Sequence, residues 1–196
     1  SGDFLAPVWN GHQFFDKPPL FYWVTAFSMK LFGVNEWSIR AVSAATGVGT
    51  VLLVYLLSER LFGNRKISII SSIILASTIA FVYRSRTGNM DTFLTFWLTL
   101  GVYAIYTKRR FVLAVAIIAA FLTKWFIAFI FPILFVVWMR TNWKTVGIAL
   151  AFAIAWIAGY AVVYGQPFLD GFWFNQFNKV APGVFSFDYL LYMKSG

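Results

Sequence analysis

The sequence predicts an all-α protein, a polytopic bundle of about six transmembrane helices with one further helix lying along the membrane surface. Hydrophobic residues make up 60% of the chain and charged residues 12%, which is typical of proteins embedded in a bilayer. Long apolar stretches alternate with short polar loops, and the basic residues collect in every second loop. The chain has no cysteine and one histidine, so a disulfide framework, a thiolate metal site and a histidine-rich metal site are excluded.

Residues 1–34 are expected to form an external loop that ends in an interfacial helix. Residues 1–16 are rich in turn-forming types, and Pro18-Pro19 then begins a helix that ends at Gly33. This aromatic helix is too short to cross ~30 Å of hydrocarbon at ~1.5 Å per residue. We therefore expect it to lie along the membrane.

Residues 35–164 are expected to hold the six spans. Asn35 is a suitable cap for a long helix over 36–62, and further spans follow over 67–83 and 90–106. A polar turn separates the second of these spans from the third.

The apolar stretch 111–139 is interrupted by Lys124, and we interpret it as two short helices that meet at an external turn. A single long helix would bury this ammonium near the middle of the bilayer, at a cost of at least ~2.5 kcal/mol. A last span over 146–164 then runs outward, and residues 165–196 form an external segment.

Basic residues determine the orientation. They cluster at 60–66, 108–110 and 140–144, and these loops are therefore assigned to the cytoplasm. The acids expected on the other side are Asp3, Asp16, Glu36, Asp91, Asp170 and Asp188. This asymmetry accounts for the net charge of +9 without a nucleic-acid partner. We expect a multi-pass protein of a prokaryotic plasma membrane, with its active site on the extracytoplasmic face and membrane lipids around it.

The most specific polar motif is Asp16-Lys17, directly before Pro18-Pro19. The prolines restrict the backbone, so the two charged side chains have a defined orientation. A fixed Lys can neutralise a departing phosphate, and a fixed Asp can hold a divalent cation or position an acceptor. The same spacing also suits an ordinary helix start with a solvated ion pair.

A second candidate region is the polar turn 84–91, which carries Arg86 and Asp91. Asp91 lies in the first turn of the following span, where a carboxylate also favours the helix dipole. Lys124, between two apolar helices, is expected either to have an anionic partner or to extend to the interface. Lys179 lies in the external segment.

Taken in order, these motifs resemble the GT-C glycosyltransferases, in particular the branch of the lipid A aminoarabinose transferases and the protein O-mannosyltransferases. The resemblance is carried by Ser1-Gly2-Asp3-Phe4-Leu5-Ala6-Pro7, Phe15-Asp16-Lys17-Pro18-Pro19-Leu20, Arg86-Thr87-Gly88 with Met90-Asp91, and Leu122-Thr123-Lys124. It implies an inverting transferase that moves a sugar from a polyprenyl phosphate to an extracytoplasmic lipid, protein or glycan.

The resemblance also implies roles for individual residues. Asp16 and Asp91 match acidic positions of the site, and Lys17 matches a lysine that contacts the donor phosphate. We expect Arg86, Lys124 and Lys179 to help bind that phosphate, and Asp16 to hold one divalent metal ion. Trp125 stands where the family usually has Gly after the lysine. The family's principal catalytic acid precedes the segment that begins here, so we expect a fragment, truncated at both ends and inactive alone.

Two other functions remain open. A transporter or lipid flippase would have ionisable groups or broken helices through the middle of the membrane, whereas the charges here cluster at one face. A non-catalytic scaffold would tolerate substitution of Asp16, Lys17 and Asp91 together.

Overall fold

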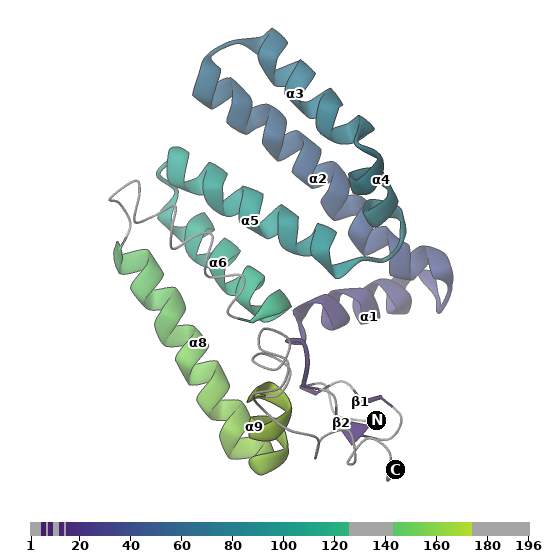
Figure 1. Cartoon of the computed structure of the whole chain (residues 1–196), viewed down its shortest axis with the longest axis vertical. Coiled ribbons are helices and arrows are strands. Elements are labelled where there is room, and N and C mark those ends of the chain that lie inside the picture. Colours follow the sequence, from purple (N-terminus) through teal and green to yellow (C-terminus); the bar gives the residue numbers. More distant parts are fainter. Residues whose placement is uncertain (1–4, 7, 10–11, 14, 126–142, 174–196) are drawn as a thin grey trace, which may run out of the picture. The chain divides into compact units, whose positions relative to one another are not determined.

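The computed structural model forms two compact units. The smaller unit comprises Ser1–Lys17 together with Ile154–Gly196, and the larger unit comprises Pro18–Ala153. The structure describes residues 5–6, 8–9, 12–13, 15–125 and 143–173 (Figure 1). The larger unit holds helices α1 to α6 and the beginning of α8. The smaller unit holds strands β1 and β2, helix α9 and the rest of α8.

Helices α1, Leu20–Phe32, and α2, Glu36–Phe62, lie where the sequence predicts them. The predicted cap is confirmed, because the side chain of Asn35 accepts a hydrogen bond of 2.9 Å from the backbone N–H of Ser38. Gly63 ends α2 with a φ of 60°, which glycine adopts without a steric penalty. With 27 residues, α2 is long enough to cross the hydrocarbon layer.

The prediction of one continuous span over 67–83 was wrong. The chain forms α3, Arg65–Ser77, and α4, Ile79–Arg86, with a bend of 63° between them. The hydroxyls of Ser77 and Thr78 both donate to the carbonyl oxygen of Ile74, at 3.1 and 2.8 Å. These bonds replace the backbone bond that Thr78 would give in a continuing helix, so the helix stops and restarts.

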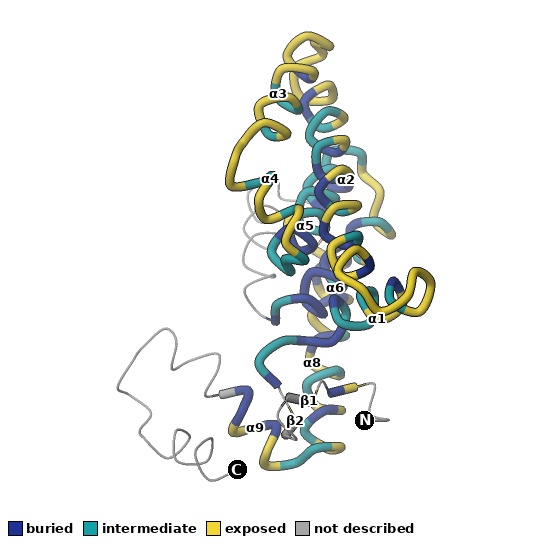
Figure 2. The backbone as a smooth tube through the Cα atoms, turned by 90° about the vertical axis from the view of Figure 1, so that its right-hand side faces the viewer, coloured by how far each residue is buried: buried dark blue, intermediate teal, exposed yellow. Residues whose placement is uncertain are grey.

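Helices α5, Met90–Tyr106, and α6, Arg110–Lys124, pack against each other, and α5 also packs against α2 (Figure 1). A Cβ atom on Gly101 would lie 3.7 Å from the Cβ of Ala116, an ordinary van der Waals distance, so the contact between α5 and α6 does not require glycine there. Helix α6 is largely buried, whereas α3 is mostly exposed (Figure 2). The predicted end of the first short helix at Lys124 is confirmed; the second helix of that pair lies outside the described residues.

The smaller unit contains one difference from the sequence prediction, which treated residues 1–16 as a loop. Strands β1, Val8–Trp9, and β2, His12–Gln13, pair antiparallel, with Val8 opposite Gln13. An Asn-Gly pair separates the two strands in the sequence, and this dipeptide is typical of two-residue hairpin connections. The prediction failed because two-residue strands are too short to show an alternating pattern.

The last predicted span is confirmed as α8, Trp143–Tyr164, which begins three residues before the predicted start at 146. A short helix, α9, Gln166–Trp173, follows it within the predicted external segment. The rest of that segment, 174–196, lies outside the described residues.

Two of the described helices, α2 and α8, are each long and apolar enough to cross a membrane, and the bent pair of α3 and α4 would make a third span. Helices α5 and α6 have 17 and 15 residues, which is short for a span, and α1 is a shorter apolar helix, whose position along the membrane stays a prediction. The predicted all-α membrane class is confirmed.

Candidate functional site

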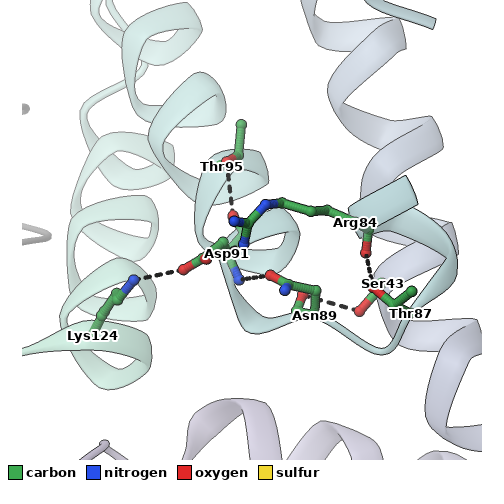
Figure 3. A network of polar contacts seen from close by, with 7 residues as sticks. All are labelled: Ser43, Arg84, Thr87, Asn89, Asp91, Thr95 and Lys124. Atoms are coloured by element: carbon green, nitrogen blue, oxygen red, sulfur yellow. Dashed lines mark hydrogen bonds and ion pairs between the residues drawn. The ribbon is translucent and has the colours of Figure 1, made fainter. Parts of the chain in front are cut away.

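Asp91 is the centre of a charged cluster at the beginning of α5 (Figure 3). Its two carboxylate oxygens accept hydrogen bonds from different cations: Oδ1 from Lys124 Nζ of α6 at 2.5 Å, and Oδ2 from Arg84 Nη1 of α4 at 2.8 Å. These are charge-assisted bonds, which are stronger than neutral ones. We call Arg84, Asp91 and Lys124 the Asp91 cluster; it carries one net positive charge.

The loop before α5 holds Asp91 in place. Asn89 caps the helix, with its side-chain oxygen 2.7 Å from the backbone N of Asp91. The hydroxyl of Ser43 in α2 donates to the backbone oxygen of Asn89 at 3.0 Å, which ties the loop to its neighbour. Gly88 has a φ of 62°, and a Cβ atom there would lie 3.0 Å from Ile39, so this turn requires glycine.

The structure pairs Asp91 with Arg84 and not with Arg86, the arginine that the sequence analysis selected. Arg84 and Arg86 lie two positions apart on α4, about 200° around a helix, so they point in different directions. Sequence reasoning missed Arg84 because nothing in the local pattern distinguishes it. Arg86 instead lines two surface grooves with Arg40.

The expectation that Lys124 has an anionic partner is confirmed. Its side chain is 28% exposed, so a partner compensates for much of its lost hydration. The residue after it, Trp125, is buried and has a φ of 40°, in the region that favours glycine. This conformation explains physically why a Gly suits the position that Trp125 occupies here.

The other sequence motif, Asp16-Lys17, belongs to the smaller unit. Lys17 Nζ lies 3.0 Å from Asp16 Oδ2 and donates to the Asp16 backbone oxygen at 3.4 Å. The side chains of Lys17 and Asp16 are only 23% and 13% exposed, so this is not the solvated pair of an ordinary helix start. Phe15, packed edge-on against Tyr164 and Phe168 with ring centroids 5.1 and 5.4 Å away, anchors the loop.

The expected divalent metal ion finds no complete ligand set in the part of the chain that the structure describes. No three His, Cys, Asp or Glu side chains come together there, and Asp16 forms an ion pair with the ammonium of Lys17. These residues alone do not fit a metal site, since a divalent ion needs several oxygen ligands. Lys179, the remaining predicted residue, lies outside the described residues.

Comparison with known proteins gives the family. Residues 16–164 match the family described as dolichyl-phosphate-mannose-protein mannosyltransferase. The chain belongs to this family. The match covers both Asp16-Lys17 and the Asp91 cluster.

The relatives of this chain include bacterial proteins. The chain is 34% identical over 184 residues to an uncharacterized protein of Aquifex aeolicus, which covers 89% of the chain. It is 31% identical over 159 residues, 74% of the chain, to the undecaprenyl phosphate-alpha-4-amino-4-deoxy-L-arabinose arabinosyl transferase of Pseudomonas aeruginosa. The resemblance to aminoarabinose transferases and protein mannosyltransferases is therefore confirmed.

Solved structures show the same fold. ArnT from Cupriavidus metallidurans bound to undecaprenyl phosphate superimposes with a TM-score of 0.77 over 90% of this chain, at 19% identity, and its apo state gives 0.73 over 89%. The chain spans 35% of the Aquifex protein, 29% of the Pseudomonas transferase and 37% of ArnT. It has the GT-C fold over that part.

Proposed function

We propose that the protein containing this chain transfers a sugar from a polyprenyl phosphate to an acceptor on the extracytoplasmic side of the plasma membrane. The observation that supports this most is the convergence of Arg84 and Lys124 on Asp91, from three helices of a membrane-type bundle. The surplus positive charge suits an anionic headgroup at the membrane surface. Family membership and the similarity to an undecaprenyl-phosphate-dependent transferase support the same donor class.

The proposed reaction is a single inverting displacement. The oxygen of an acceptor hydroxyl forms a bond to the anomeric carbon of the sugar and gives up its proton to water, the bond from that carbon to the phosphate oxygen breaks, and the phosphate leaves with the electron pair. Lys17 and Lys124 stabilise the charge that grows on the departing phosphate, because cations fixed before the reaction need no reorganisation during it. Lys179 is a further phosphate-binding residue that the sequence predicts. The sequence also predicts Arg86 for this task, but Arg86 lines two grooves that include no residue of the Asp91 cluster.

The two carboxylates are proposed to have different tasks. Asp91 has both oxygens engaged by cations, so it is suited to hold Lys124 and Arg84 in position. Asp16 is held in place by its ion pair with Lys17, at 3.0 Å, and is suited to position the acceptor near the phosphate. The divalent metal ion remains a prediction, since the described residues do not supply a complete ligand set for it.

A specific test is transfer from a polyprenyl-phosphate sugar by the complete protein in membrane vesicles. Lys17→Ala and Lys124→Ala are each expected to lower the transfer rate about 100-fold or more, the usual cost of removing a fixed group that stabilises developing charge. Lys30→Ala is the matched control, since Lys30 is an exposed lysine at the end of α1 and should leave the rate unchanged. Wild-type rates in both test variants would refute the proposal.

The 63° bend between α3 and α4 favours one alternative, a transporter or lipid flippase, because broken helices are common in such proteins. The same vesicles separate the two functions. A flippase would move a fluorescent polyprenyl phosphate across the bilayer without forming a new glycosidic bond, whereas a transferase would form the bond with the donor supplied on one side.

A further inference from the structure

Two apolar grooves on the larger unit meet at a pair of arginines. The first has a volume of about 420 Å³ and lies beside the beginning of α2, where Phe32 and Ala44 line it. The second has a volume of about 480 Å³ and lies along α4, where Val82 lines it. Arg40 and Arg86 line both grooves. Both volumes fall within the range of about 300–1,000 Å³ that is typical of ligand pockets.

The two guanidinium groups have too few anions near them. Arg40 pairs with Glu36 at 2.9 Å, but the two side chains are 51% and 77% exposed, so the pair is weak. The side chain of Arg86 makes no ion pair or hydrogen bond with any residue that the structure describes. Neither groove is lined by an Asp or a Glu. A single negative charge between the arginines would complete the charge balance.

The second groove lies at the break in the return segment. Ser77 and Ile79, on either side of the break at Thr78, both line it. The bend of 63° turns α4 away from the direction of α3 at this position. Irregular backbone at a membrane span is tolerated where protein, water or a polar ligand satisfies it.

The arginine pair also lies at the level expected for lipid headgroups. Arg40 is in the second turn of the long span α2, and Arg86 is the last residue of α4. Trp37, in the first turn of α2, lines the first groove and is 81% exposed, as is typical of tryptophans anchored at the membrane surface.

We propose that this surface binds an anionic phospholipid, with its phosphodiester between Arg40 and Arg86 and one acyl chain in each groove. Two grooves on either side of one charged point match a lipid with two chains better than a polyprenyl phosphate, which has one. No residue of the Asp91 cluster lines either groove. The lipid site is therefore separate from the Asp91 cluster, with Arg86 assigned to the lipid and not to the donor phosphate, and it requires only that the protein be embedded in a membrane.

The test measures lipid retained by the complete protein, purified in mild detergent, by native mass spectrometry. Phosphatidylglycerol is expected to bind more tightly than phosphatidylcholine, and the double variant Arg40→Gln, Arg86→Gln to lower its occupancy about tenfold or more. The matched control is Arg60→Gln with Arg65→Gln, which removes the same charge at the other end of α2 and should leave occupancy unchanged.

A second pair of variants tests the grooves without changing charge. Ala44→Phe fills the first groove and is expected to lower phosphatidylglycerol occupancy, whereas Ala45→Phe, at an exposed neighbour that lines neither groove, should not. The proposal is overturned if phosphatidylcholine binds equally well, or if the double arginine variant keeps its lipid. It is also overturned if undecaprenyl phosphate or millimolar inorganic phosphate displaces the lipid, because the groove would then be a donor site or a simple anion site.

Discussion

At the scale of single residues, Asp91 and Lys124 show how a charge at a membrane helix end acquires its partner. The two residues are 33 positions apart in the sequence, yet Lys124 Nζ lies 2.5 Å from Asp91 Oδ1. Both were identifiable from sequence, because a carboxylate in a first turn and an ammonium inside an apolar stretch are each unusual. Their pairing, and the addition of Arg84, required the packing of α4, α5 and α6.

Trp125 is one of two non-glycine residues with a positive φ in the part of the chain that the structure describes, the other being Lys108. Its φ of 40° is costly for a residue with a Cβ atom, about 1–3 kcal/mol. Burial compensates, since the side chain is 1% exposed and stacks edge-on against Phe121 with ring centroids 5.7 Å apart. Packing therefore maintains a backbone conformation that glycine would adopt without strain.

This conformation predicts an unusual order of stabilities at position 125. Trp125→Gly and Trp125→Ala both remove the buried ring and should each lower the free energy of unfolding by about 3–5 kcal/mol. Of the two, the Gly variant is expected to be more stable by about 1 kcal/mol, because only Ala keeps the backbone strain. Thermal unfolding of the complete protein in detergent measures the difference.

Phe121 provides the control for this prediction. It is buried inside helix α6, where the backbone has ordinary helical angles. There the order should reverse, with Phe121→Ala more stable than Phe121→Gly by about 1 kcal/mol. An Ala variant more stable than the Gly variant at both positions would contradict the strain at Trp125.

At the scale of the elements, α2 packs closely against its neighbours because it carries glycines where they approach. A Cβ atom on Gly47 would lie 2.9 Å from the Cβ of Ser85 in α4, and one on Gly49 would lie 2.7 Å from the ring of Phe96 in α5. Small residues at such contacts are common between membrane helices, since they allow the backbones to come together. The hydropathy of α2 predicts a span, but not which of its faces packs against protein.

Gly47→Ala is therefore expected to destabilise the protein by about 1–3 kcal/mol, because the added methyl meets the short, fixed side chain of Ser85 and the helices must separate. Gly147→Ala in α8 is the matched control, since a Cβ atom there has nothing within 4 Å. The control should be neutral or stabilising by up to about 1 kcal/mol, from helix propensity alone. Melting temperatures in the same detergent compare the two; equal shifts would contradict the close contact.

At the scale of the whole molecule, the exposed surface is that of a membrane protein. Helix α3, for example, has five exposed isoleucines: Ile67, Ile69, Ile70, Ile73 and Ile74. Such an apolar surface is unfavourable in water and natural in contact with lipid. The two ends of α2 differ in the charges around them. The charged residues at 60–66, near its end, are all basic (Arg60, Arg65 and Lys66), whereas the Asp91 cluster, which also contains a carboxylate, lies near its beginning.

The proposed topology predicts the labelling of single cysteines, for which this chain is suited because it contains none. In intact cells, Thr87→Cys should react with a membrane-impermeant maleimide, since its loop is assigned to the extracytoplasmic side. Lys66→Cys and Arg109→Cys should react only after permeabilisation, because short basic loops remain in the cytoplasm. Any cysteines elsewhere in the complete protein are first replaced. Reaction of Thr87→Cys and Lys66→Cys from the same side would refute the proposed topology.

The sequence by itself determined the class of the protein, the position of most helices and the family. Hydropathy, caps such as Asn35 and stops such as Gly63 are local signals, and each acts through the residues immediately around it. For this reason α2 matched the prediction at both ends. Asp16, Lys17, Asp91 and Lys124 could be selected because charges are rare in an apolar chain.

Only the tertiary structure decided which of these groups act together. The choice of Arg84 over Arg86, the bond from Lys124 to Asp91 and the meeting of Arg40 with Arg86 all depend on how α2, α4, α5 and α6 pack. The break at Thr78 depends on hydroxyls competing for one carbonyl, which hydropathy does not register. Contacts between residues far apart in the chain follow from the packing of complete helices, and no local pattern encodes them.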